Sequence, residues 1–176
     1  IIKFILKKIE KKNKFVFFDV GANTGQSIDR FLAYNYQTLI HSFEPTPELF
    51  KTLETKYAKR ISKGQIFINK FGLGNSTGEM DFYSFKYNQI NSFVPIEKDS
   101  KFEKSRKIAT NKSSSEFEEK IKAEVATLDI YCKKNKITEI DLMKIDTQGF
   151  EPEVLDGSLE MLSNQKIKIL EIELIL

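Results

Sequence analysis

The sequence is poor in the residues that build metal and disulfide sites. Its 176 residues include one cysteine, Cys132, and one histidine, His41. A single cysteine excludes an internal disulfide framework and a cysteine-rich zinc site. A single histidine excludes every site that needs two imidazoles, including that of the H-E-x-x-H proteases. We therefore expect Cys132 and His41 to be structural side chains inside the fold.

A strong charge imbalance and long apolar runs are also missing. Lys and Arg total 28 against 25 Asp and Glu, so the formal net charge of +3 is too small to indicate a protein held to nucleic acid by bulk charge. No stretch approaches the roughly 20 consecutive apolar residues of a membrane-spanning helix. Since no export signal is visible and Cys132 is unpaired, we expect a cytoplasmic protein.

The overall composition is that of a folded domain. Hydrophobic residues make up 40% and charged residues 30% of the chain, and the length leaves room for one domain, 1–176. Residues 1–14 carry apolar side chains near helical spacing with lysines between them, which predicts an amphipathic helix on the domain or on a membrane surface. The chain begins without Met and ends inside an apolar run, so we expect a fragment of a longer protein.

Short apolar segments alternate with segments of helical periodicity. We expect buried strands at 15–20, 39–43, 65–71, 141–145 and 167–176. Apolar residues at i, i+3 and i+4, such as Ile28, Phe31 and Leu32, predict helices between them. This alternation is typical of βαβ units and predicts a doubly wound α/β domain, with a mostly parallel, Rossmann-like sheet and helices on both faces.

Three further segments complete the expected organisation. Residues 79–85 alternate and predict an additional edge strand. Residues 97–120 are polar with mixed charges and predict a mobile, solvated insertion, with a lid over a bound acceptor as the alternative. A helix is expected from about Leu128, and one further helix carries the apolar residues from Val154 to Leu162.

Polar residues gather where the predicted strands end. The first strand ends in the loop Asp19–Gly25, the second at Glu44, the third at Gly72–Asn75 and the fourth at Asp146, and the last carries Glu171 and Glu173. Ligands of doubly wound sheets bind outside the carboxyl ends of the strands. Core packing does not explain such a concentration of carboxylates, amides and glycines, so we expect the functional site at this edge.

The loop Asp19–Gly25 leads directly into a helix. It is not a P-loop, because Gly25 is followed by Gln26 and Ser27 rather than by Lys and a hydroxyl residue. It also lacks two of the three glycines of the dinucleotide fingerprint. We therefore expect a ligand with a carboxylate for the loop amides and an ammonium for Asp19, as in S-adenosylmethionine. A plain chain reversal is the alternative.

Glu44 ends the second strand at a position that is typical of ribose binding. A carboxylate about twenty residues after a glycine loop commonly accepts hydrogen bonds from both ribose hydroxyls. Alternatively, Glu44 interacts with the dipole of the helix that begins at Thr46-Pro47. The two roles are compatible.

Three segments resemble the FkbM-type methyltransferases, which are class I S-adenosylmethionine-dependent enzymes with a Rossmann-like sheet. The segments are DVGANTGQ (19–26), FEPTPELF (43–50) and LDIYCKKNKITEIDLMKIDTQGFEPEVLDGS (128–158). The similarity covers about residues 15–174, nearly the whole chain. It departs from the family at the C-terminus, because a complete class I sheet has two further strands beyond Leu176.

The resemblance implies a cofactor and a set of residues that bind it. S-adenosylmethionine should have its methionine end at the glycine loop, its ribose at Glu44 and its adenine near Leu73. The residues expected to bind it are Asp19, Gly21, Ala22, Asn23, Thr24, Gly25, Glu44, Pro45, Gly72, Leu73 and Asp146. Asp146 should also lie beside the transferred methyl group and the acceptor.

Methyl transfer to a hydroxyl requires a base for the acceptor proton. The candidates are Asp146, Glu171 and Glu151, with His41 less favoured, and we prefer Asp146 because it ends the central strand next to the cofactor loop. An orienting role for Asp146 is the alternative. Two carboxylates could instead hold a divalent cation, but nothing in the sequence requires a metal and we expect none.

The sequence thus predicts an S-adenosylmethionine-dependent O-methyltransferase that acts on a sugar, a glycan or a small molecule. A non-catalytic binding module of the same fold is the alternative, although the presence of Asp19, Glu44 and Asp146 together argues against it. A nucleic-acid substrate is not expected, because the strand end Ile145-Asp-Thr-Gln lacks the N/D-P-P-Y pattern.

Overall fold

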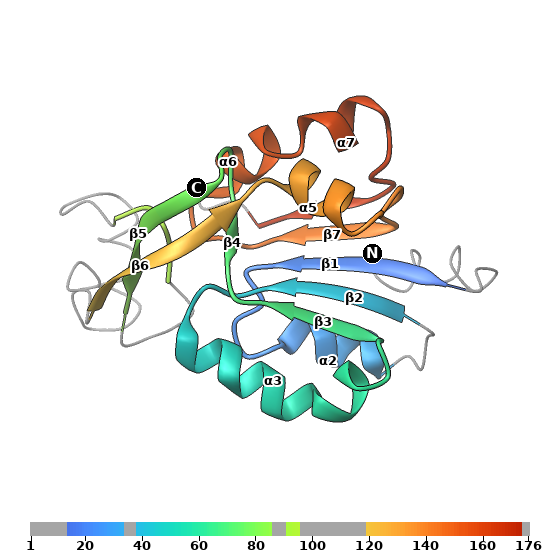
Figure 1. Cartoon of the computed structure of the whole chain (residues 1–176), viewed down its shortest axis with the longest axis horizontal. Helices are drawn as coiled ribbons and strands as arrows, with labels where there is room; N and C mark the ends of the chain where they lie inside the picture. Colours follow the sequence, from blue (N-terminus) through green and yellow to red (C-terminus); the bar gives the residue numbers. More distant parts are fainter. Residues whose placement is uncertain (1–13, 34–37, 86–90, 96–118, 174–176) are drawn as a thin grey trace.

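The computed structural model describes residues 14–33, 38–85, 91–95 and 119–173 (Figure 1). The expected N-terminal helix, apart from Lys14, lies outside the described residues. So do the expected insertion, apart from residues 119 and 120, and the last three residues of the expected final strand. Within the described part of the chain, no helix has the length and apolarity needed to cross a membrane.

Five parallel strands form the main sheet, in the order β3-β2-β1-β7-β8. They are β1 (Phe15–Val20), β2 (Thr38–Phe43), β3 (Ile66–Asn69), β7 (Leu142–Ile145) and β8 (Leu170–Ile172). β1 lies in the middle, and the chain winds outward from it first to one side and then to the other. The predicted doubly wound parallel sheet is confirmed, and its topological switch lies between β1 and β7.

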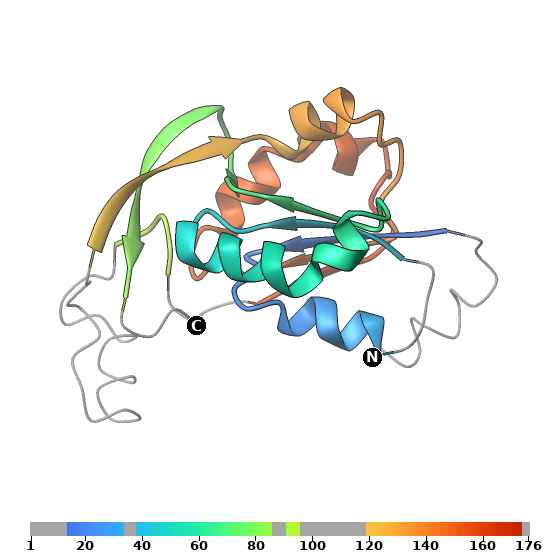
Figure 2. The same ribbon diagram turned by 60° about the horizontal axis from the view of Figure 1, so that its bottom comes forward.

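Helices cover both faces of this sheet, as Figures 1 and 2 show. One face packs against α2 (Gln26–Leu32) and α3 (Pro47–Ile61), and the other against α5 (Leu128–Lys134), α6 (Glu151–Asp156) and α7 (Leu159–Ser163). Because strand side chains alternate, Phe17 of β1 faces the first layer and Phe18 the second, and both are fully buried. A strand with both faces covered is mostly apolar, and β1 is easy to find in the sequence because Asp19 is its only polar residue.

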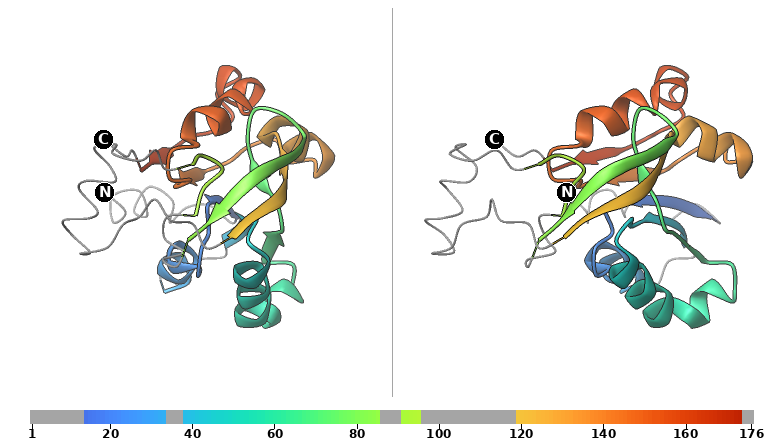
Figure 3. Two further views of the ribbon diagram at one scale, coloured as in Figure 1. Left: turned by 90° about the vertical axis from the view of Figure 1, so that its left-hand side faces the viewer. Right: turned by 60° about the vertical axis from the view of Figure 1, so that its left-hand side comes forward.

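A second, smaller sheet stands beside the main one (Figure 3). It has the order β4-β6-β5, with β4 (Gly72–Leu73) parallel and β5 (Gly78–Ser84) antiparallel to β6 (Glu119–Ala126). The predicted edge strand exists, but it forms the edge of this second sheet. β6 corrects the prediction for 97–120, because residues 119 and 120 belong to a strand and not to an insertion.

The last predicted helix is divided in two. α6 ends at Asp156 and α7 begins at Leu159, with Gly157 and Ser158 between them. A Cβ atom on Gly157 would overlap the carbonyl oxygen of Gly74. The backbone at Gly157 therefore packs directly against the backbone that follows β4 of the second sheet.

Candidate functional site

A cavity of about 440 Å³ opens at the carboxyl ends of β1, β2, β7 and β8. This is the edge at which the sequence places the functional residues, and the volume is within the range of small-molecule and cofactor sites. Of the expected residues, the lining includes Gly21, Ala22, Asn23, Glu44, Pro45, Gly72, Leu73, Asp146 and Glu171. Asp19, Thr24, Gly25 and Glu151 were also expected at the site, but they are not part of the lining.

The glycine loop is held in a shape that only glycine adopts easily. Gly21 and Gly25 have φ values of 83° and 84°, in the left-handed region. The amides of Gly21 and Ala22 both donate to the carbonyl oxygen of Phe43, at 3.2 and 3.1 Å. A Cβ atom on Gly21 would overlap the carbonyl oxygen of Asp146. The loop is thus fastened to β2 on one side and touches the end of β7 on the other.

Glu44 connects the ends of β1 and β2. Its Oε2 accepts from the backbone amide of Asn23 at 2.8 Å, and its Oε1 accepts from the amide of Thr46 at 2.9 Å. The side chain is 4% exposed, and this burial raises the pKa of the carboxyl group, whereas the two amides lower it. Each oxygen keeps a second lone pair, so Glu44 can still accept from a ligand hydroxyl in the cavity.

Asp19 lies directly behind the cavity wall with its carboxyl group unsatisfied. It is 1% exposed, and neither carboxylate oxygen has a hydrogen-bond partner among the described residues. Burial raises its pKa to about 7, although the positive charge of Lys144 acts in the opposite direction. A buried polar group without a partner is rare in folded proteins and is a candidate for ligand binding.

Lys144 lies at the centre of the acidic groups on one face of the sheet. The strand register places it between Asp19 of β1 and Glu171 of β8. Its Nζ lies 2.7 Å from Oδ2 of Asp146, while Oδ1 of Asp146 accepts from Gln148 Nε2 at 2.8 Å. Lys144 and Asp146 therefore form an ion pair at the end of β7.

Glu173 also lines the cavity, at the edge where the sequence placed it together with Glu171, although it was not among the candidate bases. Its backbone amide donates to the carbonyl oxygen of Ile145 at 3.0 Å, which brings it beside Asp146. The negative charge of Asp146, followed by desolvation and a hydrogen bond to the same residue, raises the pKa of Glu173. The two carboxyl groups therefore form a coupled pair.

Glu151 has a different environment from the other candidate bases. Its carboxylate accepts from the amide and hydroxyl of Thr147, at 2.9 and 3.0 Å, and from the amide of Gly149 at 2.9 Å. It is 4% exposed and not part of the cavity lining. Its contacts stabilise the loop between β7 and α6, which corrects the expectation that it faces the reacting groups.

His41 and Cys132 are buried inside the fold, as expected. The imidazole of His41 stacks on Phe18 and Phe67, with ring centroids 4.9 and 4.8 Å apart, and its Nδ1 lies 2.8 Å from the hydroxyl of Tyr131. Burial lowers the pKa of His41 to about 4 and raises that of Cys132 to about 12. Neither residue lines the cavity.

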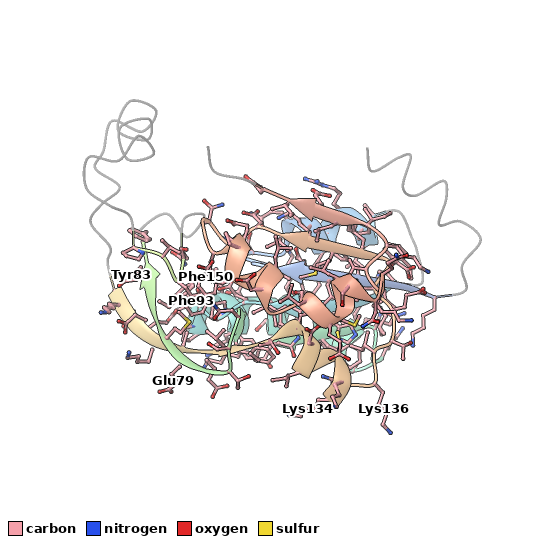
Figure 4. All side chains as sticks on the ribbon, turned by 90° about the horizontal axis from the view of Figure 1, so that it is seen from above. Glu79, Tyr83, Phe93, Lys134, Lys136 and Phe150 are labelled. Carbon is pink, nitrogen blue, oxygen red and sulfur yellow. The ribbon has the colours of Figure 1, made fainter. Side chains whose placement is uncertain are left out.

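Several lining residues were not singled out as site residues from the sequence. Gln26, Ser27 and Arg30 follow helical spacing on α2 and form one wall. Asn91 and the aromatic residues Phe82 and Phe93 form another wall. Figure 4 shows Phe93 beside Phe150 of the α6 region, and their ring centroids are 5.0 Å apart. Periodicity along α2 was the available signal for the first wall, whereas the second depends on tertiary packing.

The lining has more negative than positive side chains. It contains four carboxylates, Glu44, Asp146, Glu171 and Glu173, against the cations Arg30 and Lys144. Asp19 adds a fifth acidic group behind the wall. Within the described ranges, no group of three or more His, Cys, Asp or Glu residues is arranged to hold a metal ion. The excess of carboxylates around a glycine loop therefore suits an organic ligand with positive charge.

This topology defines a Rossmann-like α/β domain whose cavity lies at the switch between β1 and β7. Residues 19–176 match the family model described as Methyltransferase FkbM domain. The chain belongs to that family. A solved structure, the methyltransferase FkbM from Methylobacillus flagellatus, shares the fold with a TM-score of 0.55 and 16% identity, over 90% of this chain and 33% of that one.

Three curated relatives are named as methyltransferases. The hexuronic acid methyltransferase AglP of Haloferax volcanii is 26% identical over 98% of this chain, and the 2-O-methyltransferase NoeI of Sinorhizobium fredii is 23% identical over 92%. Methyltransferase sdnD of Sordaria araneosa is 30% identical over 82%. The chain spans 61%, 64% and 60% of the lengths of these proteins, in that order.

Proposed function

We propose that this protein transfers a methyl group from S-adenosylmethionine to a hydroxyl group of a sugar or sugar acid. The observation that carries the proposal is the cavity between the glycine loop and Glu44, in which four carboxylates oppose two cations. S-adenosylmethionine has a positive sulfonium, an ammonium, a carboxylate and a ribose diol. An acidic cavity bordered by a glycine loop suits the positive groups and the diol of this combination.

The residues present fit each part of this cofactor. Gly21, Ala22 and Asn23 would bind the methionine end, with the unsatisfied carboxyl group of Asp19 close behind them. The remaining lone pairs of Glu44 would accept from the ribose hydroxyls. The wall at Pro45, Gly72 and Leu73 offers apolar contact for an adenine ring, and these residues line one side of the cavity.

The cofactor supplies an electrophilic methyl group on a good leaving group, so the protein contributes alignment and electrostatics. Asp146 and Glu171 face the cavity at the ends of β7 and β8, where the acceptor would enter. Asp146 is oriented by Lys144 and Gln148. Glu151 would act indirectly as a positioning residue, because its carboxylate holds the loop that follows Asp146.

The acceptor class is supported by the names of two relatives. One is named for hexuronic acid and another for transfer to a 2-oxygen. Asn91 and Arg30 are polar groups on the cavity walls that can bind sugar hydroxyls or a carboxylate. S-adenosylmethionine is a cytosolic cofactor and Cys132 is a free thiol, so the cytoplasm is the expected location.

Calorimetric titration with S-adenosylmethionine and S-adenosylhomocysteine tests the cofactor. We expect micromolar affinity, and Glu44→Gln should weaken it about 10- to 100-fold, because hydrogen bonds to a charged acceptor contribute about 1.5–3 kcal/mol. Glu48→Gln is the matched control, since Glu48 is exposed four residues further along the chain and should leave affinity unchanged. Failure of a folded chain to bind either ligand would contradict the proposal and favour a non-catalytic module.

A further inference from the structure

Two of the carboxylates that the sequence names as candidate bases, Asp146 and Glu151, already have hydrogen-bond partners within the chain. Asp146 already has both carboxylate oxygens engaged, Oδ2 by Lys144 at 2.7 Å and Oδ1 by Gln148 at 2.8 Å. Glu151 is occupied by loop amides, and its carboxylate does not line the cavity. An acceptor hydroxyl at Asp146 would therefore share the carboxylate with the Lys144 ammonium and the Gln148 amide, and Glu151 does not line the cavity.

Glu173 differs from these two residues in position and partner. It lines the cavity, is exposed to solvent, and follows β8 at the point where its amide pairs with Ile145. Because Ile145 pairs with Ile172 in register, the next residues along the two strands, Asp146 and Glu173, lie next to each other. The negative charge of Asp146 raises the pKa of Glu173, so the two carboxyl groups interact electrostatically.

Resting on the proposed function, we propose that Glu173 receives the proton of the acceptor hydroxyl and that Asp146 is its positioning residue. In the transfer, the acceptor oxygen forms a bond to the methyl carbon, and the carbon–sulfur bond breaks with its electron pair left on sulfur. The hydroxyl proton passes to the Glu173 carboxylate. Since this side chain is exposed, it then releases the proton to solvent.

The charges around Glu173 favour its role as a base. Asp146 and Glu151 raise its pKa and Lys144 lowers it, with Asp146 the largest influence. Glu171 on its own strand and Arg30 on α2 line the same cavity. A general base is most effective when its pKa lies close to the working pH, so a carboxyl group with a raised pKa suits this task.

NMR titration of the side-chain carboxyl carbons in the chain without cofactor tests the coupling independently of activity. We expect Glu173 to titrate above the ordinary range of Glu, and Asp146→Asn to move its midpoint down toward that range. The substitution removes the negative charge of Asp146 and leaves Lys144 without its ion-pair partner, and both changes lower the pKa of Glu173. An ordinary midpoint in the wild type, or one that Asp146→Asn leaves unchanged, would overturn the proposal.

Kinetics with a uronic acid acceptor then separate this inference from the proposed function. Glu173→Gln should lower the rate of methyl transfer about 100-fold or more while its affinity for S-adenosylmethionine stays that of the wild type. Glu171→Gln, which changes the neighbouring carboxylate of the same strand, should have the smaller effect. A wild-type rate for Glu173→Gln would overturn the inference and leave the proposed methyltransferase function intact. If the wild-type chain does not bind the cofactor, the proposed function itself is overturned.

Discussion

The two sides of the cavity hold their carboxylates in different ways. At the ends of β1 and β2, Asp19 and Glu44 are 1% and 4% exposed, and no positive side chain forms an ion pair with either of them among the described residues. At the ends of β7 and β8, Asp146 is partly exposed and Glu173 is exposed, their carboxyl groups interact electrostatically, and Lys144 pairs with Asp146.

This difference separates two tasks. A buried carboxylate with fixed backbone partners can recognise a ligand but cannot exchange protons readily with water. An accessible, coupled pair can take up a proton and release it. The β1–β2 side is therefore suited to binding a cofactor, and the β7–β8 side to chemistry on an acceptor. Four substitutions test this division, in order of decreasing expected effect.

Gly21→Ala should push the glycine loop away from the end of β7, where the two sides of the cavity meet. The left-handed backbone costs a non-glycine residue about 1–2 kcal/mol, and the overlap of Cβ with the Asp146 carbonyl adds to it, so we expect a loss of unfolding free energy of about 3 kcal/mol or more. Gly64→Ala is the control, because Gly64 has a φ of 64° but no atom within 4 Å of its Cβ position. Urea denaturation of both variants measures the difference, and equal losses would contradict the close contact.

Lys144→Met should affect both sides, because Lys144 lies between their acidic groups. Without Lys144, the partly buried negative charge of Asp146 has no ion-pair partner. We expect the free energy of unfolding to fall by about 3 kcal/mol at pH 7. Lys168→Met also removes a lysine between two carboxylates, Glu139 and Asp141, but Lys168 is 39% exposed, and it should cost about 1 kcal/mol or less. Thermal unfolding compares the two, and similar shifts would argue against a special role of Lys144.

Asp19→Asn should stabilise the chain without cofactor and weaken its cofactor affinity. The folded-state pKa of about 7 lies above the ordinary Asp value of 3.8, so between these pH values the folded state binds more protons than the unfolded state. The stability of the folded state therefore falls as the pH rises from 4 through 7. The variant lacks this fall, and at pH 8 we expect a gain on the order of 2 kcal/mol. Asp156→Asn, an exposed control, should keep the wild-type pH dependence. A stability of Asp19→Asn that still falls between pH 4 and 7 would show that another group is responsible.

Ser92→Ala should disturb the β7–β8 side alone and have the smallest effect. Its buried hydroxyl donates to the carbonyl oxygens of Gln148 and Thr147, at 2.9 and 3.1 Å, and accepts from the amide of Val94. We expect a loss of about 1–2 kcal/mol in urea denaturation, with cofactor affinity unchanged. Ser62→Ala removes an exposed hydroxyl that donates to the carbonyl oxygen of Lys59, and it should lower the free energy of unfolding by about 0.5 kcal/mol or less. A large loss of cofactor affinity in Ser92→Ala would show that the two sides are not independent.

Local pattern in the sequence predicts the main sheet and the edge at which the site lies. β1 and β7 are short apolar runs, and parallel strands bring their carboxyl ends together, so Glu44, Asp146 and Glu171 share one cavity as expected. β6 was missed because its exposed residues are charged, from Glu119 to Glu124. Its inward side chains are few, and the strand depends on pairing with β5.

The finer division of the site was not accessible from sequence pattern. Glu173 becomes a partner of Asp146 only through the register of β7 and β8, and a shift by one residue would turn it to the other face of the sheet. Glu151 was predicted to face the reacting groups, since nothing in the sequence shows that the amides of Thr147 and Gly149 lie within its reach. The break at Gly157 depends in the same way on a distant residue, Gly74.

The backbone contact between Gly21 and Asp146 has a consequence for how relatives with this fold can diverge. Because this contact is made by main-chain atoms, it does not depend on which side chain follows β7. On the proposed function, it keeps the cofactor loop beside the strand end at which the acceptor enters. Regioselectivity is left to the wall formed by Phe82, Asn91 and Phe93, which can vary to admit a different hydroxyl to the same methyl group.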